Sequence, residues 1–179
     1  MADIAAPRST AIWTGLYIGL SGLIIFGQLL PLQTMPRTAA MPDLILVVTL
    51  VWVARKPEAA PLLAVAGVFF MADFLFQRPP GLMTGLVLIG TEVLRRRAES
   101  LKAATFWEEW ASAAACVAGI SAAYWGAHAV FLIPSAEPVL AVMQTVATAA
   151  IYPVVVAATW ALFGLRRPMP GEARKGLQR

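Results

Sequence analysis

Six apolar runs, separated by short segments rich in proline or charge, leave few folds open to this chain. A helix needs about 20 residues to cross the hydrocarbon core of a membrane, and about 17 is the lower limit. The first, fifth and sixth runs meet that length, the third is borderline, and the second and fourth are short. The runs cover roughly Ala11–Leu30, Pro42–Ala54, Pro61–Gln77, Gly81–Leu94, Trp110–Ile133 and Val139–Leu165.

The composition requires lipid as the main solvent. Hydrophobic residues make up 59% of the 179 and charged residues only 13%, whereas a soluble domain carries about 25% charged residues. We therefore predict an all-α bundle of six transmembrane helices, residues 11–165. A short N-terminal segment, residues 1–10, precedes it, and a basic tail, residues 166–179, follows it.

The basic residues predict the orientation. If the N-terminus is cytoplasmic and the chain crosses six times, only Arg37 and Arg78 of the 14 Lys and Arg residues fall in outer loops. Cytoplasmic loops carry such an excess of positive charge, so we expect both termini in the cytoplasm. The same clustering at the ends of apolar runs argues against nucleic-acid binding, which needs a basic patch or stripe.

Four ionisable residues lie close to or within the apolar runs. Asp73 stands in the middle of the third run, where a carboxylate is costly unless it faces protein or water. Asp43 begins the second run, where it is able to cap free N–H groups. Arg78 lies at the outer boundary near Asp73, and Glu92 precedes Arg95 and Arg96 at helical-pair spacing.

These polar residues have two interpretations. In the first they are structural, as a helix cap, a buried hydrogen-bonded carboxylate and a surface ion pair. In the second, Asp43 and Asp73 form a polar site near the outer leaflet for a partner, an ion or a small ligand. Both interpretations are compatible with the sequence.

Small residues recur at four-residue spacing on three of the predicted helices. Membrane helices associate through such residues because they let two backbones approach closely. These faces either pack inside this bundle or receive a membrane helix of another protein. The candidates are Gly15, Gly19, Gly81, Gly85, Ala115, Gly119 and Ala123.

Catalytic chemistry has little support in the sequence. His128 is the only histidine and Cys116 the only cysteine, so a multi-ligand metal site or a paired-cysteine site lacks its residues. There is no glycine-rich phosphate loop. We predict a protein that is not an enzyme, with no catalytic residues, no metal and no cofactor.

The segment Arg95–Trp110 mixes basic, acidic and aromatic residues. We expect it to lie as a short helix on the cytoplasmic leaflet, held by membrane lipids, or to dock a cytoplasmic partner. Trp107 and Trp110 are expected to act as anchors at the membrane interface.

Several short stretches, in this order and spacing, resemble the rod-shape-determining protein D (MreD) family of bacteria. The stretches are Pro42-Asp43-Leu44, the region Gly67–Gly81 with Asp73 inside it, Arg78-Pro79-Pro80-Gly81-Leu82, and Glu92 followed by Leu94-Arg95-Arg96-Arg97. A proline in the last run, in Tyr152-Pro153, also fits the family.

The resemblance implies a multi-pass protein of the bacterial inner membrane that supports wall elongation, peptidoglycan synthesis and cell shape. Its implied partners are MreC and, through the elongation complex, MreB, RodA and a penicillin-binding transpeptidase. The family has no known catalytic residues to transfer. Its helical arrangement is thought to be similar to the substrate-binding subunits of energy-coupling-factor transporters, so a small-solute-binding or transport subunit is the alternative function.

Overall fold

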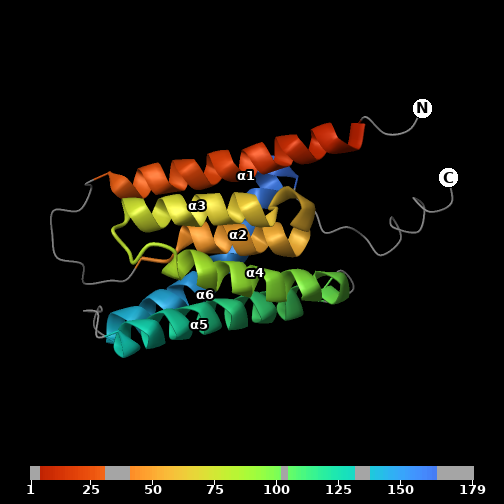
Figure 1. The fold of residues 1–179 in the computed structure, drawn as a ribbon. Coiled ribbons are helices and arrows are strands. Elements are labelled where there is room, and N and C mark those ends of the chain that lie inside the picture. The colour runs from red at the N-terminus through yellow and green to blue at the C-terminus, as the bar shows by residue number, and fades with distance from the viewer. Residues whose placement is uncertain (1–4, 31–40, 102–104, 132–137, 165–179) are drawn as a thin grey trace.

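The structure is a computed structural model, which describes residues 5–30, 41–101, 105–131 and 138–164. Successive helices run in opposite directions, and the start of α1 and the end of α6 lie at the same end of the molecule (Figure 1). The described residues form six α-helices and the short 3-10 helix η1 (Pro57–Ala59). The α-helices are α1 (Ala5–Leu29), α2 (Leu44–Arg55), α3 (Leu62–Leu75), α4 (Leu82–Leu101), α5 (Phe106–Val130) and α6 (Pro138–Phe163).

Helix α2 is the centre of the bundle. Its 12 residues include no charged side chain before Arg55, and every residue from Ile45 to Val53 is buried. It contacts α1, α4, α5 and α6. A helix that is apolar on all sides is stable only when it is surrounded, so its sequence places it inside the other helices.

Helices α1, α5 and α6 instead turn much of their apolar surface outward. Leu23 is 67% exposed, Val130 78% and Leu162 74%. These three helices are long and apolar enough to cross a membrane. The predicted all-α class is therefore confirmed, as are three helices that fit a membrane protein. The six crossings and the position of the termini stay a prediction, since α2 and α3 have only 12 and 14 residues.

Two helices extend beyond the apolar runs that predicted them. Helix α1 begins at Ala5, within the predicted N-terminal segment. Helix α4 continues past Leu94 to Leu101, and α5 begins at Phe106. The described part of Arg95–Trp110 therefore belongs to the ends of two long helices and not to a separate surface helix. A capping box explains the early start of α5, because Thr105 and Glu108 bond reciprocally to each other's backbone N–H groups. The predicted tail 166–179 lies outside the described residues.

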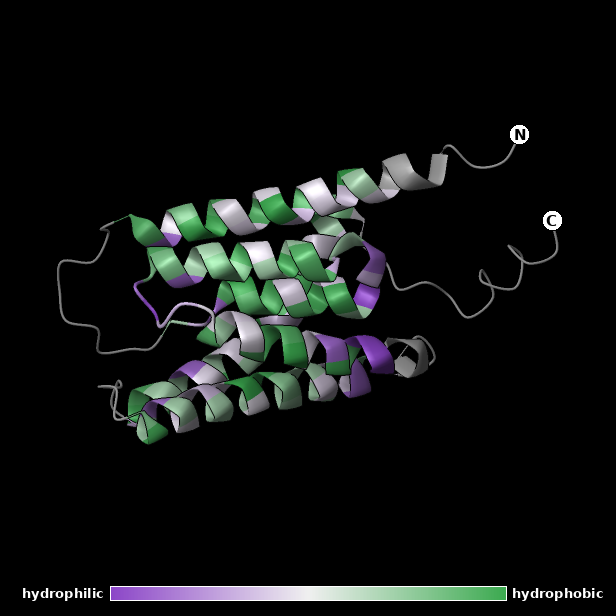
Figure 2. Ribbon diagram, in the orientation of Figure 1, coloured by the Kyte–Doolittle hydropathy of each residue, from purple (hydrophilic) through white to green (hydrophobic). Residues whose placement is uncertain are grey.

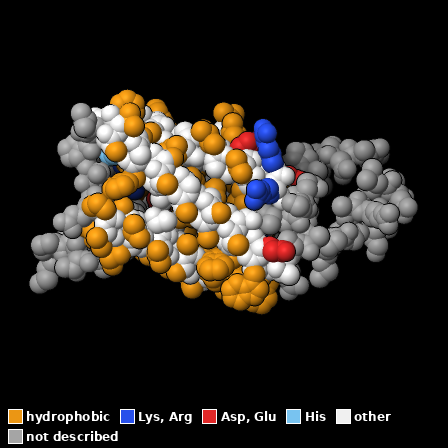
Figure 3. Space-filling model, turned by 90° about the horizontal axis from the view of Figure 1, so that it is seen from below, with side chains coloured by type: hydrophobic (Ala, Val, Ile, Leu, Met, Phe, Trp, Pro, Cys, Tyr) orange, Lys and Arg blue, Asp and Glu red, His pale blue; other side chains and the backbone are white. Residues whose placement is uncertain are grey.

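Hydrophilic residues gather at one end of the bundle, at the close of α4, the start of α5 and around η1 (Figure 2). Seen from below, the exposed Lys, Arg, Asp and Glu side chains likewise lie toward that end, while apolar side chains are spread over the rest of the described face (Figure 3). We call it the basic end, because it carries Arg55, Lys56, Arg95 and Arg96. The opposite end, at the α3–α4 turn, carries Asp43, Asp73 and Arg78.

Candidate functional sites

Asp73 is fully buried, and one of its oxygens caps the next helix. Its Oδ2 accepts hydrogen bonds from Gly81 N at 3.1 Å, from Thr84 N at 3.2 Å and from Thr84 Oγ1 at 2.8 Å. Helix α4 begins at Leu82, so these amides are among the free donors of its first turn. No described group hydrogen-bonds Oδ1. Asp73 of α3 thus performs for α4 the role that an N-cap residue ordinarily performs for its own helix.

The turn after α3 returns the chain to Asp73. Gln77 adopts a left-handed φ of 54°, Arg78 N donates to Asp73 O at 2.9 Å, and Gln77 N donates to Phe74 O at 3.2 Å. This pair of bonds is a Schellman motif, in which glycine is the usual left-handed residue. The motif reverses the chain within a few residues and sets Gly81 beside the carboxylate.

Asp43 caps α2, as the sequence predicts. Its Oδ1 accepts from Leu46 N at 3.1 Å, and its own N–H donates to Thr148 Oγ1 on α6 at 2.9 Å. Arg78, expected beside Asp73, instead has its Nη1 3.8 Å from Asp43 Oδ2. Of the three helices that begin at this end, α2 and α4 therefore each have a carboxylate at the positive N-terminal end of their dipole.

A second buried polar cluster lies at the basic end, and sequence reasoning missed it. Arg55 Nε lies 3.0 Å from Glu109 Oε1, and Tyr152 Oη donates to the same oxygen at 2.8 Å. All three residues are buried. The network joins α2, α5 and α6 at one point, and the buried carboxylate has both an opposite charge and a hydroxyl donor.

A proline next to this network leaves one backbone carbonyl of α6 without its helical donor, and a tryptophan side chain supplies a hydrogen bond instead. Pro153 lies inside α6 and has no N–H to donate to Ala149, four residues earlier. Trp110 Nε1 donates to the free Ala149 O at 2.9 Å. Trp110 is therefore half-buried against α6 and is more than the interface anchor predicted from the sequence. Trp107, at 68% exposed, fits the anchor prediction.

The ion pairs predicted for Glu92 are confirmed. Glu92 Oε2 lies 3.7 Å from Arg95 Nε, and Glu92 Oε1 lies 3.1 Å from Arg96 Nε. Arg95 also donates to Pro57 O at 2.9 Å and to Ala60 O at 2.7 Å. The pair thus orients an arginine that ties α4 to the α2–α3 turn.

Lys56 is the C-cap residue of α2 and also lies at the basic end. Its Nζ lies 3.9 Å from the centre of the Trp13 ring, which is a cation–π contact between α1 and α2. Burial lowers the pKa of Lys56 below its ordinary value, and the negative charge of Glu58 partly opposes this.

The small residues predicted to pack are not in close contact with any other part of the chain that the structure describes. A Cβ atom placed on Gly15, Gly19, Gly81, Gly85 or Gly119 would meet nothing within 4 Å. Ala115 and Ala123 are exposed. Of the two interpretations of these faces, packing within the described bundle is wrong for these positions.

The close helix contact lies at Gly90, which the four-residue spacing did not single out. A Cβ there would lie 2.7 Å from Ile120 Cδ1 and 2.9 Å from Cys116 Sγ. Gly90 therefore permits α4 and α5 to approach, because any larger residue would force these side chains to move.

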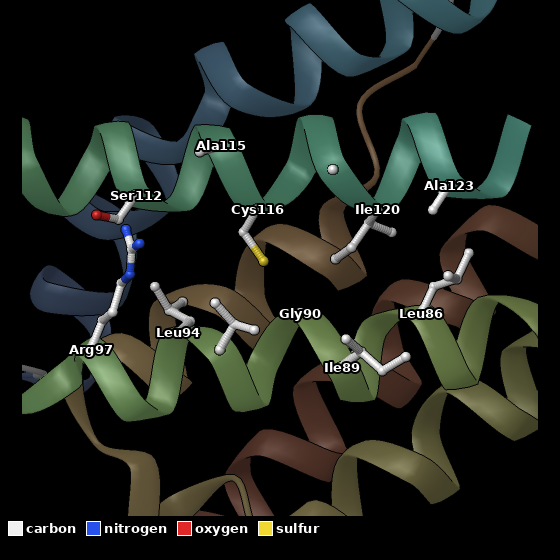
Figure 4. A pocket seen from close by; sticks show the side chains of 12 residues that line it. Leu86, Ile89, Gly90, Leu94, Arg97, Ser112, Ala115, Cys116, Ile120 and Ala123 are labelled. Atoms are coloured by element: carbon white, nitrogen blue, oxygen red, sulfur yellow. The ribbon is translucent and has the colours of Figure 1, made fainter. Parts of the chain in front are cut away.

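An outward-facing groove of about 330 Å³ runs along this α4–α5 contact. In Figure 4, Arg97 of α4 points toward Ser112 of α5 at one end of the groove. Three of the predicted small residues, Ala115, Gly119 and Ala123, also line it.

Among the described residues, no group of three or more His, Cys, Asp or Glu side chains could hold a metal ion. His128 is buried on α5, with its Nδ1 3.0 Å from Tyr124 O and its ring 4.4 Å from the Tyr124 ring.

The fold and these contacts define an all-helical protein in which three helices fit a membrane and buried polar groups join the helices. None of the protein families, curated proteins or solved structures with which we compared the chain matches it.

Proposed function

We propose that this protein is a non-catalytic scaffold of the bacterial inner membrane, related to MreD, in the complex that elongates the cell wall. In this proposal six helices cross the membrane, both termini are cytoplasmic, and the bundle binds MreC and thereby supports MreB, RodA and the penicillin-binding transpeptidase. The support is the resemblance in the Pro42-Asp43-Leu44, Asp73, Glu92 and Tyr152-Pro153 regions, together with the arrangement of polar groups.

The observation that carries the proposal is that the buried or partly buried carboxylates serve the fold. Asp73 caps α4, Asp43 caps α2, and Glu109 joins three helices. A site for solute binding or catalysis needs polar groups that converge on a cavity. Here the polar groups converge on each other, and the groove found between α4 and α5 is lined mostly by apolar side chains.

The topology has support in the alternation of the helices. The start of α1, the end of α2, the end of α4 and the start of α5 share the basic end (Figure 1). An even number of crossings would keep the basic C-terminal segment on the same side as these clusters, as the positive-inside rule requires.

We place the MreC contact on the glycine face of α1. One side of α1 is fixed to the bundle by Tyr17, Ser21 and Ile25, which are buried, and Tyr17 Oη lies 3.0 Å from Thr49 Oγ1 of α2. Gly15 and Gly19 are exposed and have open space above them. Their spacing suits the close approach of a second membrane helix.

Depletion of the protein in its own cells tests the function. We expect rounded, widening cells that recover their shape on re-expression. Cells that keep their shape while the protein is absent would refute the proposal.

Co-purification with MreC tests the contact. The double variant Gly15→Leu/Gly19→Leu should reduce recovery of MreC about tenfold, because leucine side chains prevent close helix approach. Ala118→Leu on α5 adds the same kind of bulk at another exposed position and should leave recovery unchanged. Equal recovery with all three proteins, each folded, would move the contact to another face.

One observation favours the alternative of a solute-binding or transport subunit. Asp73 Oδ1 is buried, and no described group hydrogen-bonds it. A ligand present at 100 times its Kd stabilises a protein by about 2.7 kcal/mol. A thermal-shift screen of the purified protein with vitamins, metal ions and amino acids would detect such a ligand, and a screen without any shift removes this alternative.

A further inference from the structure

The α4–α5 groove has one polar end and apolar walls. Leu86, Ile89, Val93 and Ile120 line its length, and Gly90 lies at the close contact of the two helices. Arg97 and Ser112 form the polar end (Figure 4). The remaining lining residues are Leu94, Ala115, Cys116, Gly119 and Ala123.

The depth of Arg97 follows from its neighbours on the chain. It lies one residue after Arg96 and in the last part of α4, at the basic end where hydrophilic residues gather (Figure 2). Under the proposed topology this end meets the cytoplasmic leaflet, so the guanidinium lies at the level of lipid headgroups while the groove extends toward the hydrocarbon core.

A groove on a lipid-facing surface is filled by the solvent of that surface. That solvent is acyl chains, and Ile89 and Val93, both strongly exposed beside the groove, give such a chain apolar walls. A basic side chain at the cytoplasmic end attracts a negatively charged headgroup. We propose that this groove binds one anionic phospholipid of the cytoplasmic leaflet, with an acyl chain along α4 and α5 and its phosphate at Arg97 and Ser112.

The charge of the groove distinguishes this ligand from a partner helix. A docked membrane helix would use the small side chains of α5 along the whole groove and would gain little from Arg97. A phospholipid uses both parts at once, because its charged and apolar portions have the same order as the groove's polar and apolar portions.

Native mass spectrometry of the purified full chain tests the proposal. The protein is released from micelles that contain phosphatidylglycerol or phosphatidylethanolamine with identical acyl chains. We expect retention of one phosphatidylglycerol, and Arg97→Gln should lower that retention about fivefold, the effect typical of one basic residue at an anionic surface. Arg96→Gln is the matched control, because Arg96 has a side chain 79% exposed and does not line the groove.

Filling the groove is the second test. Ala115→Phe should displace the acyl chain and lower retention about tenfold, while Ala118→Phe, outside the groove, should not.

Equal losses for Arg96→Gln and Arg97→Gln, equal retention of both lipids, or unchanged retention in Ala115→Phe would each overturn the proposal. Loss of MreC recovery in Ala115→Phe with unchanged lipid retention would assign the groove to a helix instead. Lipid retention by the isolated chain is independent of MreC binding, so this result does not depend on the proposed scaffold role.

Discussion

The carboxylates at the two ends of the bundle are stabilised in different ways. At the α3–α4 end, Asp73 and Asp43 accept hydrogen bonds from backbone N–H groups of helix N-termini. At the basic end, Glu109 is held by side chains, namely the guanidinium of Arg55 and the hydroxyl of Tyr152. The first arrangement uses donors that every helix start already possesses, whereas the second needs partners from two other helices.

This difference determines how each cluster responds to mutation. A cap is a local interaction, and its loss leaves a few amides without acceptors. An ion pair between helices is a tertiary interaction, and loss of one member leaves a buried charge of the opposite sign. The basic-end cluster should therefore be the more sensitive of the two.

The largest effect is expected for Glu109. Replacement of Glu109 by leucine removes the carboxylate that pairs with the buried Arg55 and should destabilise the protein by about 3–5 kcal/mol. Unfolding in detergent by heat or by sodium dodecyl sulfate measures this. The double variant Arg55→Met/Glu109→Leu removes both charges and should recover most of the loss. If the loss of stability in the double variant equals the sum of the losses in Arg55→Met and Glu109→Leu, Arg55 and Glu109 are not coupled.

A smaller effect is expected at Asp73. Asp73→Leu removes the acceptor of three hydrogen bonds and should cost about 2–3 kcal/mol. Asp73→Asn is the matched control, because its amide oxygen still accepts these bonds, and it should cost about 1 kcal/mol or less. Equal melting temperatures for the aspartate, asparagine and leucine proteins would contradict a capping role.

The bond between Trp110 and α6 should contribute less. Trp110→Phe leaves the Ala149 carbonyl without its donor and should cost about 1 kcal/mol. In a Pro153→Ala background the residue at 153 regains an N–H that is able to bond Ala149, so the same Trp110→Phe change should cost less. A cycle of the four proteins measures this coupling, and identical costs in both backgrounds would show that Trp110 does not compensate for the proline.

The smallest expected effect is an increase in stability from a change at Gln77, in the turn that follows α3. Gln77 has a φ of 54°, which glycine adopts without a Cβ clash. Gln77→Gly should therefore stabilise the protein by about 0.5–1 kcal/mol. Gln77→Ala keeps the Cβ and should show no gain, and a loss of stability in the glycine variant would show that the Gln77 side chain matters more than the turn.

Much of the fold could be predicted because it depends on residues close in the sequence. Apolar length and proline breaks gave the number and order of the helices. The cap by Asp43 and the pairs of Glu92 involve residues three or four positions apart. Asp73 was singled out because a carboxylate in an apolar run is expensive, although its partners proved to be Gly81 and Thr84 at the start of the next helix.

The long-range contacts could not be predicted in the same way. Arg55 and Glu109 are 54 residues apart, and each lies near a helix end, where a charged residue is ordinary. The proline at 153 was a usable signal, because it requires a donor for Ala149, but the sequence does not say that Trp110 supplies it. Spacing also nominated Gly15, Gly19 and Gly119 for packing, whereas the close contact lies at Gly90.

By itself, the sequence determined that the chain is helical and largely apolar, with three helices long enough to cross a membrane, and that its basic residues form clusters between the apolar runs, because hydropathy, capping and charge act over one helix or one loop. Only the tertiary structure decided that α2 is the enclosed helix, that Glu109 joins three helices and that the small face of α5 opens outward into a groove. These depend on which helix faces meet, and a helix that is apolar on every side carries no local information about its neighbours.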